Sequence, residues 1–88
     1  MLKERLFNSL PARVRSLRAE LSWSQARLAE EAKCSEETIS LIEQGMISFP
    51  RNIASLAAAL QVNPAWLQFG DAYATRRMPV NRPVQVAQ

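Results

Sequence analysis

SQARLAEEAKCSEETISLIEQG, residues Ser24 to Gly45, contains two short amphipathic segments separated by a tight turn. Each segment carries an apolar stripe at helical spacing, formed by Leu28, Ala29 and Ala32 in the first and by Ile39 and Ile42 in the second. Ser24 and Ser35 can cap the two segments, because a serine side-chain oxygen accepts from a free backbone N–H at a helix start. The stretch therefore predicts two helices that cross over a short connection, with one side of the second helix buried.

This segment resembles the helix-turn-helix of the phage repressor and Cro family. The resemblance covers roughly residues 9–71, including RVRSLRAEL before the helix pair and FPRNIASLAAALQVNPAWLQFGD after it. It ends in a VxxxWLxxG-like segment made by Val62, Trp66, Leu67 and Gly70. The resemblance implies an all-α, five-helix DNA-binding domain, with the helix-turn-helix at helices 2 and 3. We expect this domain to span residues 1–71.

Composition excludes several other classes of function. A single cysteine excludes an internal disulfide, and the absence of histidine argues against a metal centre or a catalytic acid–base site. Cys34 is most simply a small core residue in the turn. No apolar run approaches the roughly 18 residues of a membrane span, and the N-terminus lacks a signal-peptide core. We therefore expect a cytoplasmic protein that does not contact membranes, needs no cofactor and is not an enzyme.

The net charge of +3 gives only weak support for a nucleic-acid partner. It is fully accounted for by three arginines near the C-terminus, Arg76, Arg77 and Arg82, while the charges up to Asp71 cancel. The composition also changes after Asp71, where prolines appear and helical periodicity is lost. We expect residues 72–88 to form an extended tail or linker.

The expected first helix begins at Ser9, with Pro11 tolerated in its first turn. Its apolar stripe comprises Leu10, Val14, Leu17 and Leu21. Residues 1–8 could add a helical turn before it. Arg13 and Arg15 are expected on the solvated surface, whereas the family resemblance places Arg18 in an ion pair with Glu43.

The turn between the two central helices departs from the family pattern at Lys33. Relatives usually have glycine there, because the chain adopts a positive φ after the helix end. Lysine can adopt this conformation at a cost of about 1 kcal/mol, so the turn should still form. Gly45 is expected to end the second helix of the pair.

The resemblance implies that the helix over residues 35–44 reads bases in the major groove. Its outward or lateral positions, and thus the base-reading candidates, are Ser35, Glu36, Glu37, Thr38, Ser40 and Leu41. Glutamate can accept from cytosine N4 and leucine can contact a thymine methyl, although two carboxylates between phosphate rows are electrostatically unfavourable. The two glutamates could equally serve the helix N-terminus.

Contacts to the DNA backbone are expected from a second set of residues. The phosphate or minor-groove candidates are Ser24, Gln25, Arg18, Gln44, Ser48 and Arg51. Arg51 follows a proline, as in some family members where such an arginine lies at a narrowed minor groove with concentrated negative potential. It is the strongest single candidate for an electrostatic contact.

The last two helices should complete the core. Ile53, Leu56, Ala57 and Leu60 form an apolar stripe in the fourth helix, with Asn52 and Ser55 outward. Asn63 should cap a short fifth helix that starts at Pro64. In family relatives this helix often supplies a two-fold contact, and the matching residues are Pro64, Ala65, Trp66 and Phe69. Trp66 could also be a lid on the core.

The sequence therefore favours a repressor of the phage or prophage type, which binds a near-palindromic double-stranded DNA operator as a homodimer. An antirepressor or a second domain beyond Gln88 would be further partners. One alternative is a helical protein-interaction module that keeps the fold without DNA affinity. Another is an antitoxin, which would bind DNA and cover a toxin with its tail.

Overall fold

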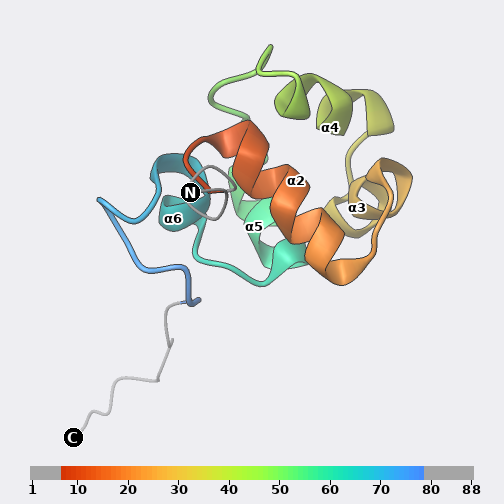
Figure 1. Ribbon diagram of the computed structural model, residues 1–88. Coiled ribbons are helices and arrows are strands. Elements are labelled where there is room, and N and C mark those ends of the chain that lie inside the picture. Colours follow the sequence, from red (N-terminus) through yellow and green to blue (C-terminus); the bar gives the residue numbers. More distant parts are fainter. Residues whose placement is uncertain (1–6, 79–88) are drawn as a thin grey trace, which may run out of the picture.

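The computed structural model describes residues 7–78, which form an all-α fold. Its helices are α2 (Leu10–Leu21), α3 (Gln25–Ala32), α4 (Glu36–Glu43), α5 (Ile53–Leu60) and α6 (Pro64–Phe69) (Figure 1). These five helices confirm the expected fold class, and α3 and α4 are the predicted helix pair. The helical turn suggested for residues 1–8 lies largely outside the described residues. Within that described part, no helix is long and apolar enough to cross a membrane.

Side-chain caps start most of the helices where the sequence predicts. Ser9, Ser24 and Ser35 precede α2, α3 and α4, and each serine accepts from the N–H three residues ahead, at 3.3, 3.0 and 3.1 Å. Asn63 caps α6 by accepting from Ala65 N–H at 2.9 Å, and Pro64 opens that helix. Each cap satisfies one of the backbone donors that a helix start leaves free.

The ends of α2, α3, α4 and α5 share one hydrogen-bond pattern. At Lys33, which follows α3, the N–H bonds the carbonyl of Glu30 and the next N–H, from Cys34, bonds that of Ala29. This is the Schellman arrangement, which requires a positive φ at the residue that donates the first of these two bonds. Lys33 has φ 60° as expected, and Gly45 has φ 80° after α4. The other two such residues, Ser22 (φ 59°) and Gln61 (φ 61°), were not anticipated.

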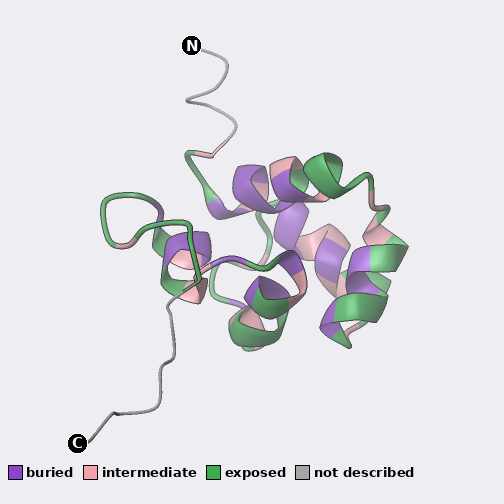
Figure 2. Cartoon of the chain, turned by 90° about the horizontal axis from the view of Figure 1, so that it is seen from below, coloured by how far each residue is buried: buried purple, intermediate pink, exposed green. Residues whose placement is uncertain are grey.

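The core lies between the helices and is built from the predicted stripes. Leu28, Ile39, Ile42, Leu56 and Val14 are completely inaccessible to solvent. Figure 2 shows the buried residues on the inward sides of the helices, with exposed residues outside. This packing fixes α4 against α2 and α3, so only its outer side faces solvent.

The expected exposure is wrong for three residues, of which Leu21 and Asn52 are the simpler cases. Leu21, the last residue of α2, is 42% exposed and does not belong to the buried stripe of that helix. Asn52 is half-buried rather than outward, and its amide nitrogen is inaccessible and has no hydrogen-bond partner in the described structure.

Arg13 is buried, contrary to the expectation of a solvated side chain, with only 4% of the residue exposed. Its Nε donates to the carbonyl of Leu67 at 2.7 Å, Nη2 to that of Gln68 at 2.9 Å and Nη1 to that of Phe7 at 2.9 Å. Burial lowers the pKa of the guanidinium, and the charge of Asp71 partly opposes this shift. Arg13 thus ties α2 to the last turn of α6, whose carbonyls carry the negative end of the helix dipole.

Candidate nucleic-acid interface

The outer side of α4 is free for a ligand because its inner side is held in the core. Ile39 and Ile42 point inward with no exposed surface. Glu36 and Glu37 are exposed in the first turn and make no hydrogen bond or ion pair within the described part of the chain. Leu41 is half-exposed.

The hydroxyl groups among the base-reading candidates have internal partners. Ser35 Oγ and Thr38 Oγ1 share a hydrogen bond at 2.9 Å, and Ser35 Oγ also accepts from the Thr38 N–H. Ser40 Oγ accepts from Nε2 of Gln44 at 2.7 Å. The two carboxylates of the first turn and Leu41 are therefore the side chains of this helix that are free to contact a ligand without exchanging a bond.

Glu43, in the last turn of α4, is the point at which three helices are joined. Its carboxylate accepts from Nε of Arg18 at 2.7 Å and from Nη2 at 3.0 Å, which confirms the expected ion pair. Nε2 of Gln25, on α3, donates to the same carboxylate at 3.1 Å. The hydrogen bond to Glu43 raises the pKa of Arg18, so this cation keeps its charge. Glu43 is only 6% exposed, and this network fixes the direction in which α4 points.

Arg15 adds a contact that the sequence did not reveal. It is exposed, as expected, but its Nη1 donates to the backbone carbonyl of Glu43 at 2.6 Å. A cation at this position also lies beside the negative end of the α4 dipole, which is a stabilising arrangement. Arg15 and Arg18 both lie on α2, three residues apart, which is the spacing that places two side chains on the same side of a helix.

The candidates for contacts to the DNA backbone differ in whether their side chains already have partners within the domain. Arg18 is committed to Glu43 and also donates to the carbonyl of Trp23 at 2.8 Å, so its place is structural. Gln25 uses one amide hydrogen on Glu43 and has a second one left, since an amide nitrogen carries two. Arg51 is exposed and has no ion pair or hydrogen bond within residues 7–78.

The remaining backbone-contact candidates lie close to the ends of α3 and α4. Ser24 caps α3 with its hydroxyl, and Gln44 is exposed directly after α4. Ser48 is exposed in the following loop, and its carbonyl accepts from Nε2 of Gln68 at 2.7 Å. These residues thus lie at the start of α3, directly after α4 and in the loop that follows α4.

A pocket of about 430 Å³ lies beside Arg51. Its walls include Thr38 of α4, Phe49, Asn52 and Cys34. Cys34 is half-buried in the turn between α3 and α4, as expected for a residue packed against the core. Burial raises the pKa of its thiol, and the nearby polar side chain of Asn52 partly offsets that shift. The thiol therefore stays protonated at neutral pH.

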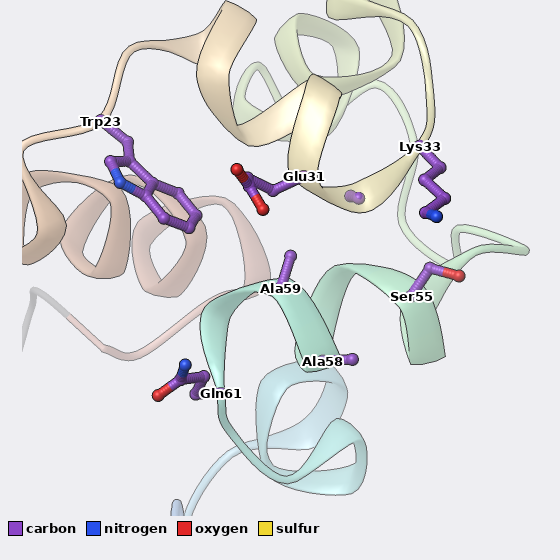
Figure 3. A pocket seen from close by; sticks show the side chains of 8 residues that line it. Trp23, Glu31, Lys33, Ser55, Ala58, Ala59 and Gln61 are labelled. Atoms are coloured by element: carbon purple, nitrogen blue, oxygen red, sulfur yellow. The ribbon is translucent and has the colours of Figure 1, made fainter.

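A second pocket, of about 440 Å³, lies between α3 and α5 (Figure 3). Glu31 points into it from α3, while Ala58 and Ala59 line the α5 side. Trp23 stands at one end and Lys33 at the other. None of the base-reading candidates lines this pocket, so it is separate from the outer side of α4.

The expected dimer-contact residues are only partly accessible. Phe69 is 52% exposed, and its ring lies 6.5 Å from that of Phe49 and 5.5 Å from that of Tyr73. Trp66 fits the alternative that makes it a lid on the core, because only 2% of it is exposed and its indole N–H donates to Asp71 Oδ1 at 2.7 Å. It is a core residue beneath the surface of α6 and offers almost no area to a partner.

Comparison with known proteins agrees with this arrangement. A family model described as a helix-turn-helix domain matches residues 9–75. The HTH-type transcriptional regulator PrtR of Pseudomonas aeruginosa is 35% identical over 74 residues, which is 84% of this chain and 29% of that protein. The HTH-type transcriptional regulator DicA of Escherichia coli is 35% identical over 77 residues, which is 85% of this chain and 56% of that protein. The chain thus spans between about a third and about half the length of these regulators.

A solved structure has the same fold. It is that of the P22 c2 repressor protein in complex with a synthetic operator, at 31% identity and a TM-score of 0.67. The match covers 72% of this chain and 97% of that one. The family and the relatives are helix-turn-helix regulators and not enzymes.

Proposed function

Because this chain belongs to the helix-turn-helix domain family, we propose that it binds double-stranded DNA and regulates transcription as a repressor of the phage or prophage type. The observation that carries the proposal is the exposed outer side of α4, which the Glu43 network holds in a fixed direction. The similarity to a repressor that was solved with a synthetic operator supports it. A regulator of this kind would act in the cytoplasm, where its DNA is.

In the proposed complex, α4 enters the major groove and presents its first turn to the base edges. Glu36 and Glu37 are acceptors only, so they would select the amino groups of cytosine or adenine. Leu41 would contact a thymine methyl. The hydroxyls of Ser35, Thr38 and Ser40 would contribute by exchanging their internal bonds for bonds to DNA.

The DNA backbone would be held at both ends of this helix pair. The N-terminus of α3, with Ser24 and the second amide hydrogen of Gln25, would donate to one phosphate. Gln44 and Ser48 would lie near another phosphate. Arg51 is an exposed cation without a partner within residues 7–78, so it can approach the phosphates without breaking a bond seen there. We assign it the main electrostatic contact.

Two copies would bind together on a near-palindromic operator, with their α4 helices about one helical turn of DNA apart. We place the two-fold contact at the exposed side of α6, where Pro64, Ala65 and Phe69 lie. The neighbouring rings of Phe49 and Tyr73, which are 72% and 75% exposed, support this choice because they extend the apolar surface. Repression would follow from exclusion of RNA polymerase.

Affinity selection from random duplex DNA tests this function. The dimeric protein should enrich an inverted repeat whose half-sites carry cytosine or adenine at the positions facing the first turn of α4. Changing both Glu36 and Glu37 to glutamine should alter the selected bases at those positions and raise the affinity for unrelated DNA, because repulsion from the phosphates is removed. Selection that enriches no common sequence, with binding to protein partners instead, would favour the interaction-module alternative.

A further inference from the structure

The segment that follows α6 lies against the domain, and Arg76 holds it there. Nη2 of Arg76 forms an ion pair with Oε1 of Glu20 on α2. The Cζ atom of Arg76 lies 5.5 Å from the ring centroid of Phe7 and 5.7 Å from that of Trp66. Its carbonyl oxygen accepts from the N–H of Asn63 at 2.9 Å. One residue thus joins α2, the segment before α2 and the start of α6.

The beginning of the same segment is fixed to the end of α6. Oδ1 of Asp71 accepts from the indole N–H of Trp66 at 2.7 Å. The backbone N–H of Tyr73 donates to the carbonyl of Gly70 at 3.1 Å. We call residues 71–76 the C-terminal strap, because this segment is attached at both of its ends.

The strap helps to keep Trp66 away from solvent. Only 2% of Trp66 is exposed, although it lies on the last helix of the described structure. Its ring is surrounded by Phe7, with ring centroids 5.9 Å apart, and by the guanidinium groups of Arg13 and Arg76, at 5.9 and 5.7 Å. Of these neighbours, only Arg76 belongs to a segment without regular secondary structure that follows the helices.

The contacts of the strap are on a different side of the domain from α4. Its hydrogen bonds, ion pair and ring contacts are with α2, α6 and Phe7. Figure 1 shows α4 at the top and the blue segment beside α6 at the lower left. A change in the strap can therefore leave the helix pair α3–α4 in place.

We propose that the C-terminal strap is a salt-sensitive closure that opens locally, releasing Arg76 from Glu20 and uncovering Trp66 while α3 and α4 stay folded. The side chains of Arg76 and Glu20 are 44% and 48% exposed, so dissolved salt screens their attraction. Segments with few buried contacts open at a lower free-energy cost than the core does. The closed strap fixes the point at which the chain leaves the domain, and the open strap releases it.

Tryptophan fluorescence of the full chain tests the proposal. In a Trp23→Phe background Trp66 is the only tryptophan, and its emission reports on its own exposure. Arg76→Ala should shift this emission to longer wavelength and increase quenching by acrylamide, with unchanged far-UV circular dichroism. Glu20→Gln, which removes the ion pair and keeps both rings, should give a smaller shift in the same direction. Raising the salt concentration should move the emission of the parent protein toward that of Arg76→Ala.

Arg77→Ala is the matched control, because Arg77 is an exposed arginine with no hydrogen bond or ion pair in the described structure. It should leave the emission and quenching of Trp66 unchanged. Equal effects of the two alanine substitutions would overturn the proposal. Loss of helical circular dichroism in Arg76→Ala would overturn it as well, because the strap would then be part of the global fold and not a local closure.

Discussion

Arg18 and Glu43 form a two-point ion pair, with Nε to Oε2 at 2.7 Å and Nη2 to Oε1 at 3.0 Å, that joins α2 to the last turn of α4. The carboxylate side chain is 4% exposed and the arginine side chain 21%. Since the pair is largely shielded from solvent, removing one member leaves the other charge poorly solvated. The pair therefore stabilises the domain and fixes the direction of α4.

Replacing Glu43 with glutamine should lower the free energy of unfolding by about 3 kcal/mol, the lower end of the range for broken buried pairs, because Arg18 keeps some contact with water. Urea denaturation measures this change. The control is Glu31→Gln, which removes the exposed pair with Arg27, whose side chains are 51% and 41% exposed. That substitution should cost less than about 1 kcal/mol. Similar losses in both variants would contradict the structural role given to Glu43.

Arg13→Met should destabilise the domain by about 3 kcal/mol, because one buried carbonyl and two partly buried carbonyls lose a charged donor. Arg13→Lys should recover little of this loss, since one ammonium cannot reproduce the planar fork that reaches Phe7, Leu67 and Gln68. Arg15→Met, on the same helix, removes one hydrogen bond at an exposed site and should cost about 1 kcal/mol. A lysine variant as stable as the parent in thermal unfolding would show that charge alone matters at this position.

Lys33→Gly should stabilise the domain by about 1 kcal/mol, because Lys33 occupies a left-handed conformation at φ 60° that glycine adopts without strain. For a domain of this size that gain raises the melting temperature by roughly 4–8 °C. Lys33→Ala is the control for loss of the charged side chain and should bring no such gain. A glycine variant no more stable than the alanine variant would contradict this explanation.

Ionisation of the Cys34 thiol should lower the free energy of unfolding at alkaline pH. Burial raises its pKa in the folded state, so the unfolded chain loses the thiol proton first as the pH rises. The contribution is fully present below the unfolded pKa of about 8.5 and is lost as the pH rises through the higher folded value. Urea denaturation between neutral pH and about pH 10 should show a steeper loss in the parent protein than in Cys34→Ala. If the free energy of unfolding depends on pH in the same way in both proteins, the Cys34 thiol is not the cause of the loss.

Arg51→Ala should weaken DNA binding uniformly across sequences and make the salt dependence shallower by about one charge, as expected for a phosphate contact. Arg77→Ala removes the same charge from the segment that follows α6, which contains none of the candidate DNA contacts, and should leave the salt dependence unchanged. Binding titrations at several salt concentrations distinguish the two variants. If both variants change the DNA affinity and its salt dependence equally, Arg51 contributes only through the net charge of the protein.

The features that the sequence alone determined are those governed by neighbours along the chain. The serine caps and Pro64 at the start of α6 follow from interactions within a few residues, whereas the left-handed conformation of Lys33 was expected from the family pattern. The apolar stripes identified most of the core for the same reason, since helical periodicity is local. The pair Arg18–Glu43 came from a family resemblance and was confirmed by the contact itself.

Only the tertiary structure decided the environment of the charged and aromatic side chains. Arginine is rarely buried, so nothing local distinguishes Arg13 from a solvated residue until α6, more than 50 residues away, brings its carbonyls to it. Arg76 contacts Glu20, Phe7 and Trp66 only because α2 and α6 are packed together. Sequence periodicity indicates which side of a helix is apolar. The partner of a particular charged side chain depends instead on distances that the whole fold sets.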